Sequence, residues 1–380
     1  MRTDNLHTGR ANASALLRKC LRLSDTVDAT VALRNLLWTS RDPWETLYEL
    51  SAQTRLAPAL YWRLKERGLL PPVPRFGQTQ TAMPGEILEG MFATNQERHA
   101  NLGADLLEIV SLLNSYNLQP ILIKGARHLW LEDVPWRSLR DLDLLLPGKQ
   151  AETAQAALIN SGYLPDKAQR DRPNRHHLAP LFRDDLAGWL EIHRRAGNPY
   201  AEQFCPTSHL VAGSRPVTKD GCTALILAEH HHVWHGVLHH HFGHSGFARG
   251  HLELKGLFEF AALFATLADE ERAALLSDAS QTALGLATLE LWLALAETEY
   301  GLAPDHKITI SHDARQFAET WIARSDGQIP NSVKYPGYRD MMAMGWNMRR
   351  CSRVKEHTGS SLFGTALAVP AMLAPKLIRN

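Results

Sequence analysis

Hydrophobic residues recur at helical spacing along the first third of the chain. Over residues 14–70, apolar positions three or four apart predict several helices. Asp42 followed by Pro43 marks the start of one helix, because aspartate caps a helix N-terminus and proline suits the first turn. A long amphipathic helix is predicted over residues 85–116, and its apolar stripe contains Leu102, Leu106, Ile109 and Leu113.

The pattern changes near residue 120, where short apolar or alternating segments replace the helical spacing. Residues 120–124 and 141–146 predict two strands, and residues 150–160 predict an alanine-rich helix. Residues 178–182 and 188–193 predict the two strands of a hairpin. The predicted strands and helix of this middle segment therefore indicate a small α/β unit.

From about residue 223 onward the helical spacing returns. It predicts helices over 224–234, 252–267, 270–278 and 281–296. The pattern as a whole predicts an α+β fold in which a small mixed sheet is embedded between two helical regions. We place the boundaries of the three parts at residues 1–116, 117–200 and 201–380.

Composition narrows the class of protein. The chain has 380 residues, 44% of them hydrophobic, and a net charge of +1, so it lacks the basic excess typical of a general nucleic-acid binder. Its four cysteines form no CxxC pair, which disfavours a disulfide framework or a cysteine-based zinc site. Neither a signal-peptide run nor an apolar stretch of membrane-spanning length is visible, so we expect a cytoplasmic protein.

The C-terminal tail allows two interpretations. Residues 361–378 are largely apolar, and residues 349–355 before them are rich in arginine and lysine. Such a tail could make peripheral contact with an anionic membrane surface. It could instead form a helix that packs on the protein's own core, which we favour because apolar helix faces more often cover a core.

Two carboxylates lie two residues apart on the strand predicted over 141–146. Asp141 and Asp143 therefore point to the same face, with Cα atoms roughly 6.5–7 Å apart, while Leu142 and Leu144 point into a core. Divalent cations that prefer oxygen ligands suit such a pair. Because these cations stabilise the attacking and leaving oxygens of phosphoryl transfer, the spacing predicts a metal site for that chemistry.

A third acidic residue lies on the strand predicted over 188–193. Alternation places Glu191 and His193 on one face of this strand, opposite its leucine and isoleucine. A carboxylate on a neighbouring strand could complete the metal site or accept a proton from an attacking hydroxyl.

Basic residues that could bind phosphate precede the aspartate pair. Lys124-Gly125 lies at a strand-to-helix turn, where glycine permits close approach and a helix N-terminus favours phosphate. Arg137 and Arg140 could bind phosphate oxygens or pair with the carboxylates. We include these four residues and His193 in the predicted nucleotide- and phosphate-binding set.

Four segments combine these motifs. They are Leu-Ile-Lys-Gly-Ala at 122–126, Arg-x-x-x-Asp-Leu-Asp-Leu-Leu-Leu at 137–146, Ser-Gly-Tyr at 161–163 and Leu-Glu-Ile-His at 190–193. Together they resemble the bacterial nucleotidyltransferase-like family of the DNA polymerase β superfold, a poorly characterised family. The resemblance covers about residues 110–270.

The resemblance implies a polymerase-β-like mixed sheet and a transferase that uses Mg²⁺ or Mn²⁺. Such an enzyme would move a nucleoside monophosphate from a nucleoside triphosphate, ATP among them, to a hydroxyl or phosphate of a small molecule or protein. Asp141, Asp143 and Glu191 would be the catalytic metal ligands, and Lys124 and Gly125 would face the triphosphate. Long nucleic acid is a less favoured acceptor because the chain has no basic excess.

Two alternatives remain open from the sequence. Ala126 stands where the wider superfamily often has serine or glycine, so the chain could be a weak or inactive nucleotide-binding module of the same fold. Nine histidines between His230 and His251 include i, i+4 pairs, which could bind a transition metal. We favour a helix and loop near the active site, with some histidines contacting the phosphate or base of the substrate.

Overall fold

A computed structural model describes residues 13–39, 42–71, 84–166, 176–199, 201–243, 253–305 and 308–325. The chain divides into two compact units. One unit is Glu89–Gly236, and the other combines Met1–Leu88 with Val237–Asn380. The fold is α+β, as the hydrophobic pattern predicts, and all the strands in the described residues belong to the first unit.

The Glu89–Gly236 unit is built on a seven-stranded mixed sheet with the order β3-β4-β5-β2-β1-β7-β6. Its two central strands, β2 and β5, run parallel, and β4 and β5 form the predicted antiparallel hairpin. The strands are β1 (Ile121–Leu122), β2 (Asp141–Leu145), β3 (Leu164–Pro165), β4 (Leu181–Phe182), β5 (Trp189–His193), β6 (Arg215–Lys219) and β7 (Cys222–Ile226).

The hairpin of β6 and β7 is an element that the hydrophobic pattern did not indicate. A helix was expected over 224–234, but the chain stays extended to Ile226 and helix α9 (Glu229–Leu238) begins afterwards. Asp220 and Gly221 form the turn with positive φ of 48° and 79°. An Asp-Gly pair in this conformation makes a tight hairpin turn, which explains why the flanking residues pair as strands.

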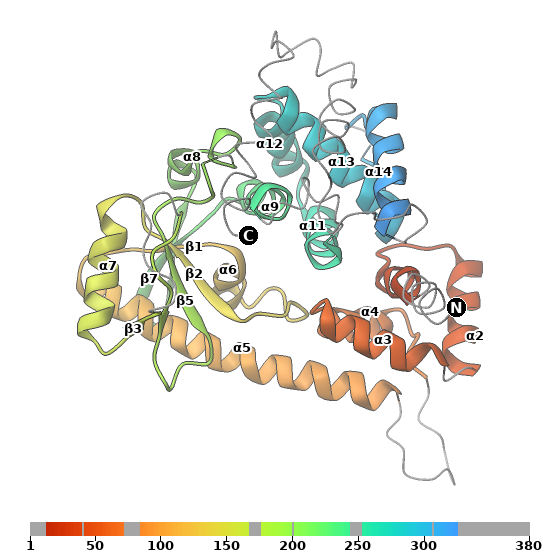
Figure 1. Ribbon diagram of the computed structural model, residues 1–380, viewed down its shortest axis with the longest axis horizontal. Coiled ribbons are helices and arrows are strands. Elements are labelled where there is room, and N and C mark those ends of the chain that lie inside the picture. The colour runs from red at the N-terminus through yellow and green to blue at the C-terminus, as the bar shows by residue number, and fades with distance from the viewer. Residues whose placement is uncertain are drawn as a thin grey trace, which may run out of the picture. The chain divides into compact units, whose positions relative to one another are not determined.

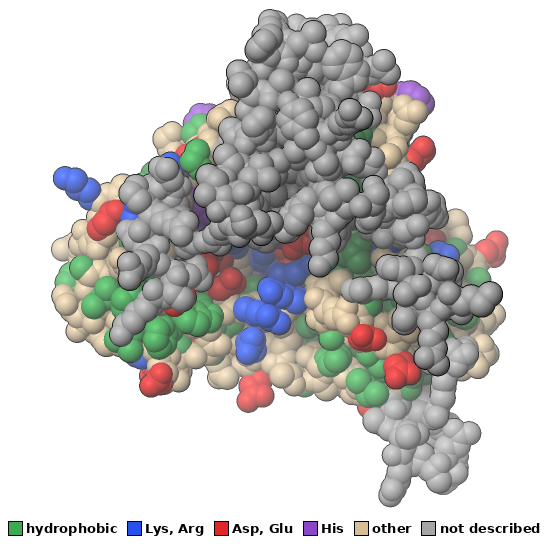
Figure 2. Space-filling model, in the orientation of Figure 1, with side chains coloured by type: hydrophobic (Ala, Val, Ile, Leu, Met, Phe, Trp, Pro, Cys, Tyr) green, Lys and Arg blue, Asp and Glu red, His purple; other side chains and the backbone are tan. Residues whose placement is uncertain are grey.

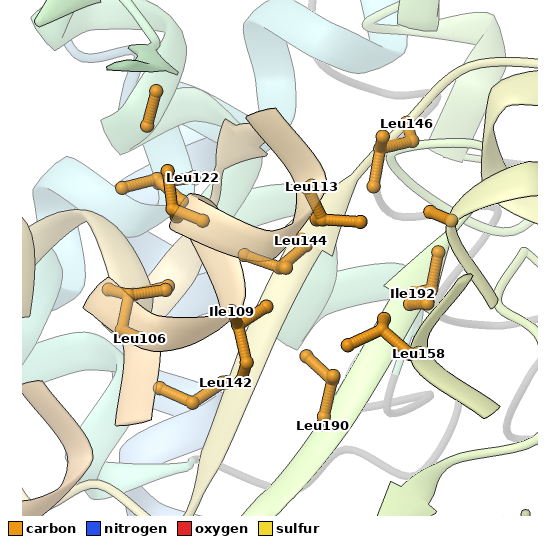
Figure 3. Packing of buried hydrophobic residues seen from close by; sticks show 14 of the residues in the cluster. Leu106, Ile109, Leu113, Leu122, Leu142, Leu144, Leu146, Leu158, Leu190 and Ile192 are labelled. Carbon is orange, nitrogen blue, oxygen red and sulfur yellow. The ribbon is translucent and has the colours of Figure 1, made fainter. Parts of the chain in front are cut away.

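One face of the sheet is covered by the long helix α5 (Pro84–Ser115), as Figure 1 shows. Its predicted apolar stripe, which contains Leu102, Leu106, Ile109 and Leu113, is fully buried. Figure 3 shows leucines of this helix packed with the inward residues of β2 and β5, namely Leu142, Leu144, Leu190 and Ile192. Each fully buried side chain of this kind contributes about 1.5–3 kcal/mol, so this packing holds the two central strands in place.

Among the described residues, four shorter α-helices lie wholly or mostly in this unit together with α5. Helix α7 adds Leu158 to the same apolar core, and α6 adds Ala126, Leu129 and Trp130. Their bounds are α6 (Lys124–Leu131), α7 (Lys149–Asn160), α8 (Thr207–Ala212) and α9 (Glu229–Leu238).

The regular structure of the other unit is helical in its described residues. A helix over 13–21 is followed by α2 (Val27–Thr39), α3 (Asp42–Gln53), α4 (Ala57–Glu66), α11 (Leu254–Thr266), α12 (Asp269–Ala279), α13 (Ala283–Tyr300) and α14 (His312–Ser325). Helix α13 is buried along most of its length, and a buried ion pair joins its Glu299 to Arg18. The N-terminal and C-terminal helical segments therefore share one core.

The C-terminal tail and part of the histidine cluster fall outside the described residues. The apolar tail at 361–378 and the basic stretch before it lie wholly outside, and the histidine cluster lacks His244 and His251. Within the described part of the chain, no helix is both long enough and apolar enough to cross a membrane.

Candidate metal and nucleotide site

Parallel pairing of β2 with β5 brings three predicted site residues together. In the register of the two strands, Asp143 lies directly beside Glu191, and Asp141 lies beside Trp189. Because side chains alternate along each strand, Asp141, Asp143, Glu191 and His193 share the face opposite the leucine core.

The closest of these groups form a compact cluster. Nε2 of His193 lies 2.8 Å from Oδ1 of Asp143 and 3.5 Å from Oε2 of Glu191. One ligand atom from each of the three residues lies within 4.8 Å of the others. Asp143 and His193 are almost completely buried, whereas the Glu191 side chain keeps 24% of its exposure. Two carboxylates and one imidazole thus converge as the ligands of a divalent cation would.

Lys124 reaches this cluster from the start of α6. Its Nζ donates to Oδ1 of Asp143 at 2.7 Å, and its side chain is 15% exposed. Lys124 has a φ of +50°, a left-handed conformation that is uncommon for residues other than glycine and is found disproportionately at functional sites.

Packing against Leu139 favours glycine at the position after Lys124. A Cβ atom at Gly125 would lie 2.5 Å from Cδ2 of Leu139, a distance far below van der Waals contact. Gly125 therefore lets α6 begin against the segment that leads into β2. The Lys-Gly pair combines a lysine aimed at the carboxylates with a position where any side chain would have to displace Leu139.

In this cluster the positive charge of Lys124 and the negative charges of the carboxylates stabilise one another. Burial opposes ionisation of Asp143, but the Lys124 ammonium and the hydrogen bond from His193 hold the pKa of this carboxyl well below its usual range. Burial also disfavours the charged form of Lys124, yet Asp143, Glu191 and Asp141 together raise its pKa. The site therefore keeps ionised carboxylates in a largely dry environment.

The other predicted residues occupy different positions. Asp141 is half-buried and acts on Lys124 through its charge, but it lies outside the closest three ligand groups. Arg140 is exposed. The backbone carbonyl of Arg137 lies 2.6 Å from Nε2 of His99, and the charge of Arg137 acts on His128. Figure 2 shows lysine and arginine side chains gathered where Figure 1 draws the segment between α6 and β2.

Ala126 does not face the same side as Lys124. It is fully buried in the leucine core of the unit. A serine hydroxyl in this position would be buried among apolar groups, so the alanine removes no contact from the carboxylate side of the fold. Ala126 therefore gives less reason to regard the chain as a weak or inactive nucleotide-binding module.

Several histidines that the motif did not include surround the cluster. The rings of His176 and His177 lie with their centroids 5.3 and 5.5 Å from that of His193. Burial, together with the charges of His193 and Lys124, lowers the pKa of His235 to about 4. Burial likewise lowers the pKa of His176 to about 2. Both rings are therefore neutral near pH 7.

A chain of hydrogen bonds joins α6 to α9. Nδ1 of His128 lies 2.7 Å from Oδ1 of Asp133, and its Nε2 lies 2.9 Å from Nε2 of His232 on α9. Arg127, which is buried, joins Asp133 to Glu229 by two ion pairs. No sequence pattern indicates this arrangement, because its members are separated by as many as 104 positions and match no local motif.

Three described histidines of the segment at 230–243, namely His235, His240 and His241, have partners of their own. Nε2 of His235 lies 2.9 Å from the carbonyl oxygen of Ala196. In the other unit, Nδ1 of His240 lies 2.7 Å from a carboxylate oxygen of Glu253, and Trp292 donates to Nδ1 of His241 at 3.1 Å. Each of these three imidazoles therefore has a structural contact that is separate from those of the other two.

Comparison with known protein families identifies a match. A family model described as uncharacterised nucleotidyltransferase matches residues 40–299, a range that contains the whole cluster and more than half of the chain. No curated protein and no solved structure matches the chain.

Proposed function

Because this chain belongs to the family of uncharacterised nucleotidyltransferases, we propose that it transfers a nucleoside monophosphate from a nucleoside triphosphate to an acceptor, using a divalent cation. Family membership supports nucleotidyltransferase activity in general. The observation that carries the specific proposal is the convergence of Asp143, Glu191 and His193 at the position where Nζ of Lys124 binds.

The donor groups fit Mg²⁺ or Mn²⁺. Two carboxylates adjacent on parallel strands offer the oxygen ligands that these cations prefer, and Asp141 lies two residues away on the same face. The Lys124 ammonium, held 2.7 Å from Asp143, supports the idea that a positive charge is accommodated here. A bound cation would neutralise the charge of the phosphate oxygens.

The residues of the chain then have distinct tasks. Lys124, at the N-terminus of α6, would exchange its contact with Asp143 for the triphosphate, where helix N-termini favour anions. Glu191, the more exposed carboxylate, would accept the proton of the acceptor hydroxyl. The acceptor oxygen forms a bond to the α-phosphorus, the bond to the bridging oxygen breaks, and pyrophosphate leaves.

The acceptor is best sought among small molecules and proteins. The net charge of +1 provides no general attraction for long nucleic acid. A hydroxyl or phosphate on a compact acceptor would meet the exposed edge of Glu191 without an extended binding surface.

Incorporation of label from triphosphates labelled at the α-phosphate tests the proposal. We expect the purified chain to transfer label from at least one of the four triphosphates, ATP being tested first, to itself or to a panel of hydroxyl acceptors. Asp143→Asn should lower the rate by at least about 10²–10³-fold, as loss of one charge-stabilising group does in other enzymes. Asp184→Asn, an exposed acidic residue beside the same strands, is the matched control and should retain the rate.

Two results would count against the proposal. Transfer that survives Asp143→Asn would separate the activity from this cluster. Cation-dependent triphosphate binding without transfer to any acceptor would instead indicate a binding module of the same fold.

A further inference from the structure

The imidazole of His193 occupies a position that a metal ligand would take. Its Nε2 points at Oδ1 of Asp143 and Oε2 of Glu191, at 2.8 and 3.5 Å. The side chain is completely buried on the same strand as Glu191, so the backbone of β5 fixes two of the three groups. A nitrogen donor is therefore part of the cluster.

The ring of His193 is held in place on its other sides. His177 pairs with His193 by an isolated antiparallel bridge, and its ring packs 5.5 Å from that of His193. Among the described residues, Nδ1 of His193 has no hydrogen-bond partner. Within the described part of the chain, the polar contacts that orient the ring are thus those of Nε2 with the two carboxylates. A cation between these groups would meet Nε2 once this nitrogen gave up its proton, leaving the ring neutral with its N–H at Nδ1.

The chemistry of the donors decides which cations fit. Carboxylate oxygens suit Mg²⁺ and Mn²⁺ alike, whereas imidazole nitrogen is a poor ligand for Mg²⁺ and a good one for borderline transition metals. Mn²⁺ combines a tolerance for mixed oxygen and nitrogen ligands with the octahedral geometry used in phosphoryl transfer. We propose that Asp143, Glu191 and Nε2 of His193 together bind Mn²⁺ in preference to Mg²⁺. This inference rests on the proposed function only in assigning the cation to a nucleotidyltransferase.

Electron paramagnetic resonance on the full chain loaded with Mn²⁺ alone tests the inference. Electron spin-echo modulation should show coupling to the nitrogen of a bound imidazole in the wild-type protein. In His193→Gln, which keeps an amide donor near the same position, this coupling should disappear. The Mn²⁺ affinity and the preference for Mn²⁺ over Mg²⁺ should each fall by about tenfold or more, as metal-site changes commonly do. His209→Gln, an exposed histidine on α8, is the control for adventitious binding and should change neither.

The outcomes separate this inference from the proposed function. The inference is overturned if the wild-type protein binds Mn²⁺ but shows no nitrogen coupling, whether or not His193→Gln folds. It is also overturned if His193→Gln folds and still shows the coupling. If label transfer is nevertheless observed, the proposed function stands alone. Nitrogen coupling without any transfer would leave the metal site in place and remove the proposed reaction. Absence of Mn²⁺ binding, even with triphosphate present, overturns the inference, and the proposed function falls with it only if label transfer is also absent with Mg²⁺.

Discussion

Lys124→Met tests whether the lysine ammonium balances the carboxylates when no cation is bound. Methionine has a similar length and keeps a Cβ, so the left-handed backbone at this position carries the same conformational cost in both proteins. The change therefore removes the charge and the hydrogen bond to Asp143 at 2.7 Å, and little else.

The expected loss of stability follows from burial. Asp143 is 1% exposed, and removing one partner of a buried ion pair costs about 3–5 kcal/mol because a charge is left without compensation. His193 still donates to the same oxygen, so we expect the lower end, about 3 kcal/mol. A cation bound at a hundred times its dissociation constant would return about 2.7 kcal/mol. Urea denaturation with and without Mn²⁺, in the absence of nucleotide, measures both quantities.

Two results would refute this reasoning. One is an unchanged free energy of unfolding for Lys124→Met in metal-free buffer. The other is a Mn²⁺ stabilisation that is as large in the wild-type protein, where the ammonium must first be displaced, as in the variant. Lys149→Met, at an exposed position on α7, is the control and should stay within about 0.5 kcal/mol of wild type.

Two further predictions concern α6. Gly125→Ala forces a methyl group against Leu139 and should lower the free energy of unfolding by about 1–3 kcal/mol in urea denaturation; Gly103→Ala, whose Cβ meets nothing within 4 Å on helix α5, should instead be neutral or stabilising. Burial lowers the pKa of His128 to about 4, below its unfolded value of about 6.5, so its contribution is complete above pH 6.5 and is lost as the pH falls toward 4. Stability should fall between those values, and His128→Gln should make that fall smaller by roughly 3 kcal/mol, while His235, whose pKa is lowered in the same way, contributes in both proteins; a fall as large in the variant as in wild type would assign the pH dependence to other groups.

The sequence predicts the elements of this fold better than their pairing. The apolar stripe of α5 is correct because helical periodicity is a local property, and the alternation of β2 correctly separates Asp143 from Leu142. The β6–β7 hairpin was missed although Asp220-Gly221 is a strong turn signal, because Leu225 and Ile226 continue into the apolar positions of α9.

The assembled site needs information that a single sequence does not contain. That Asp143 lies beside Glu191 depends on the register of two strands separated by a helix and a hairpin, and a shift of two residues would preserve every apolar position. The contact of Lys124 with Asp143 depends in addition on a left-handed backbone at one residue. The partnership of His128 with His232 joins residues 104 positions apart, and no local pattern encodes it.

The division of β2 and β5 into a leucine face and a carboxylate face also bears on misfolding. If either strand slipped by a single residue while its backbone pairing was kept, its carboxylates would turn into the leucine core under α5. Burying an unpaired carboxylate there would cost several kcal/mol, far more than a misplaced polar group on an exposed strand. The acidic residues assigned to the reaction would thus also destabilise incorrect registers of the two strands. Neutralising them should leave a chain that loses activity and in addition folds with lower fidelity.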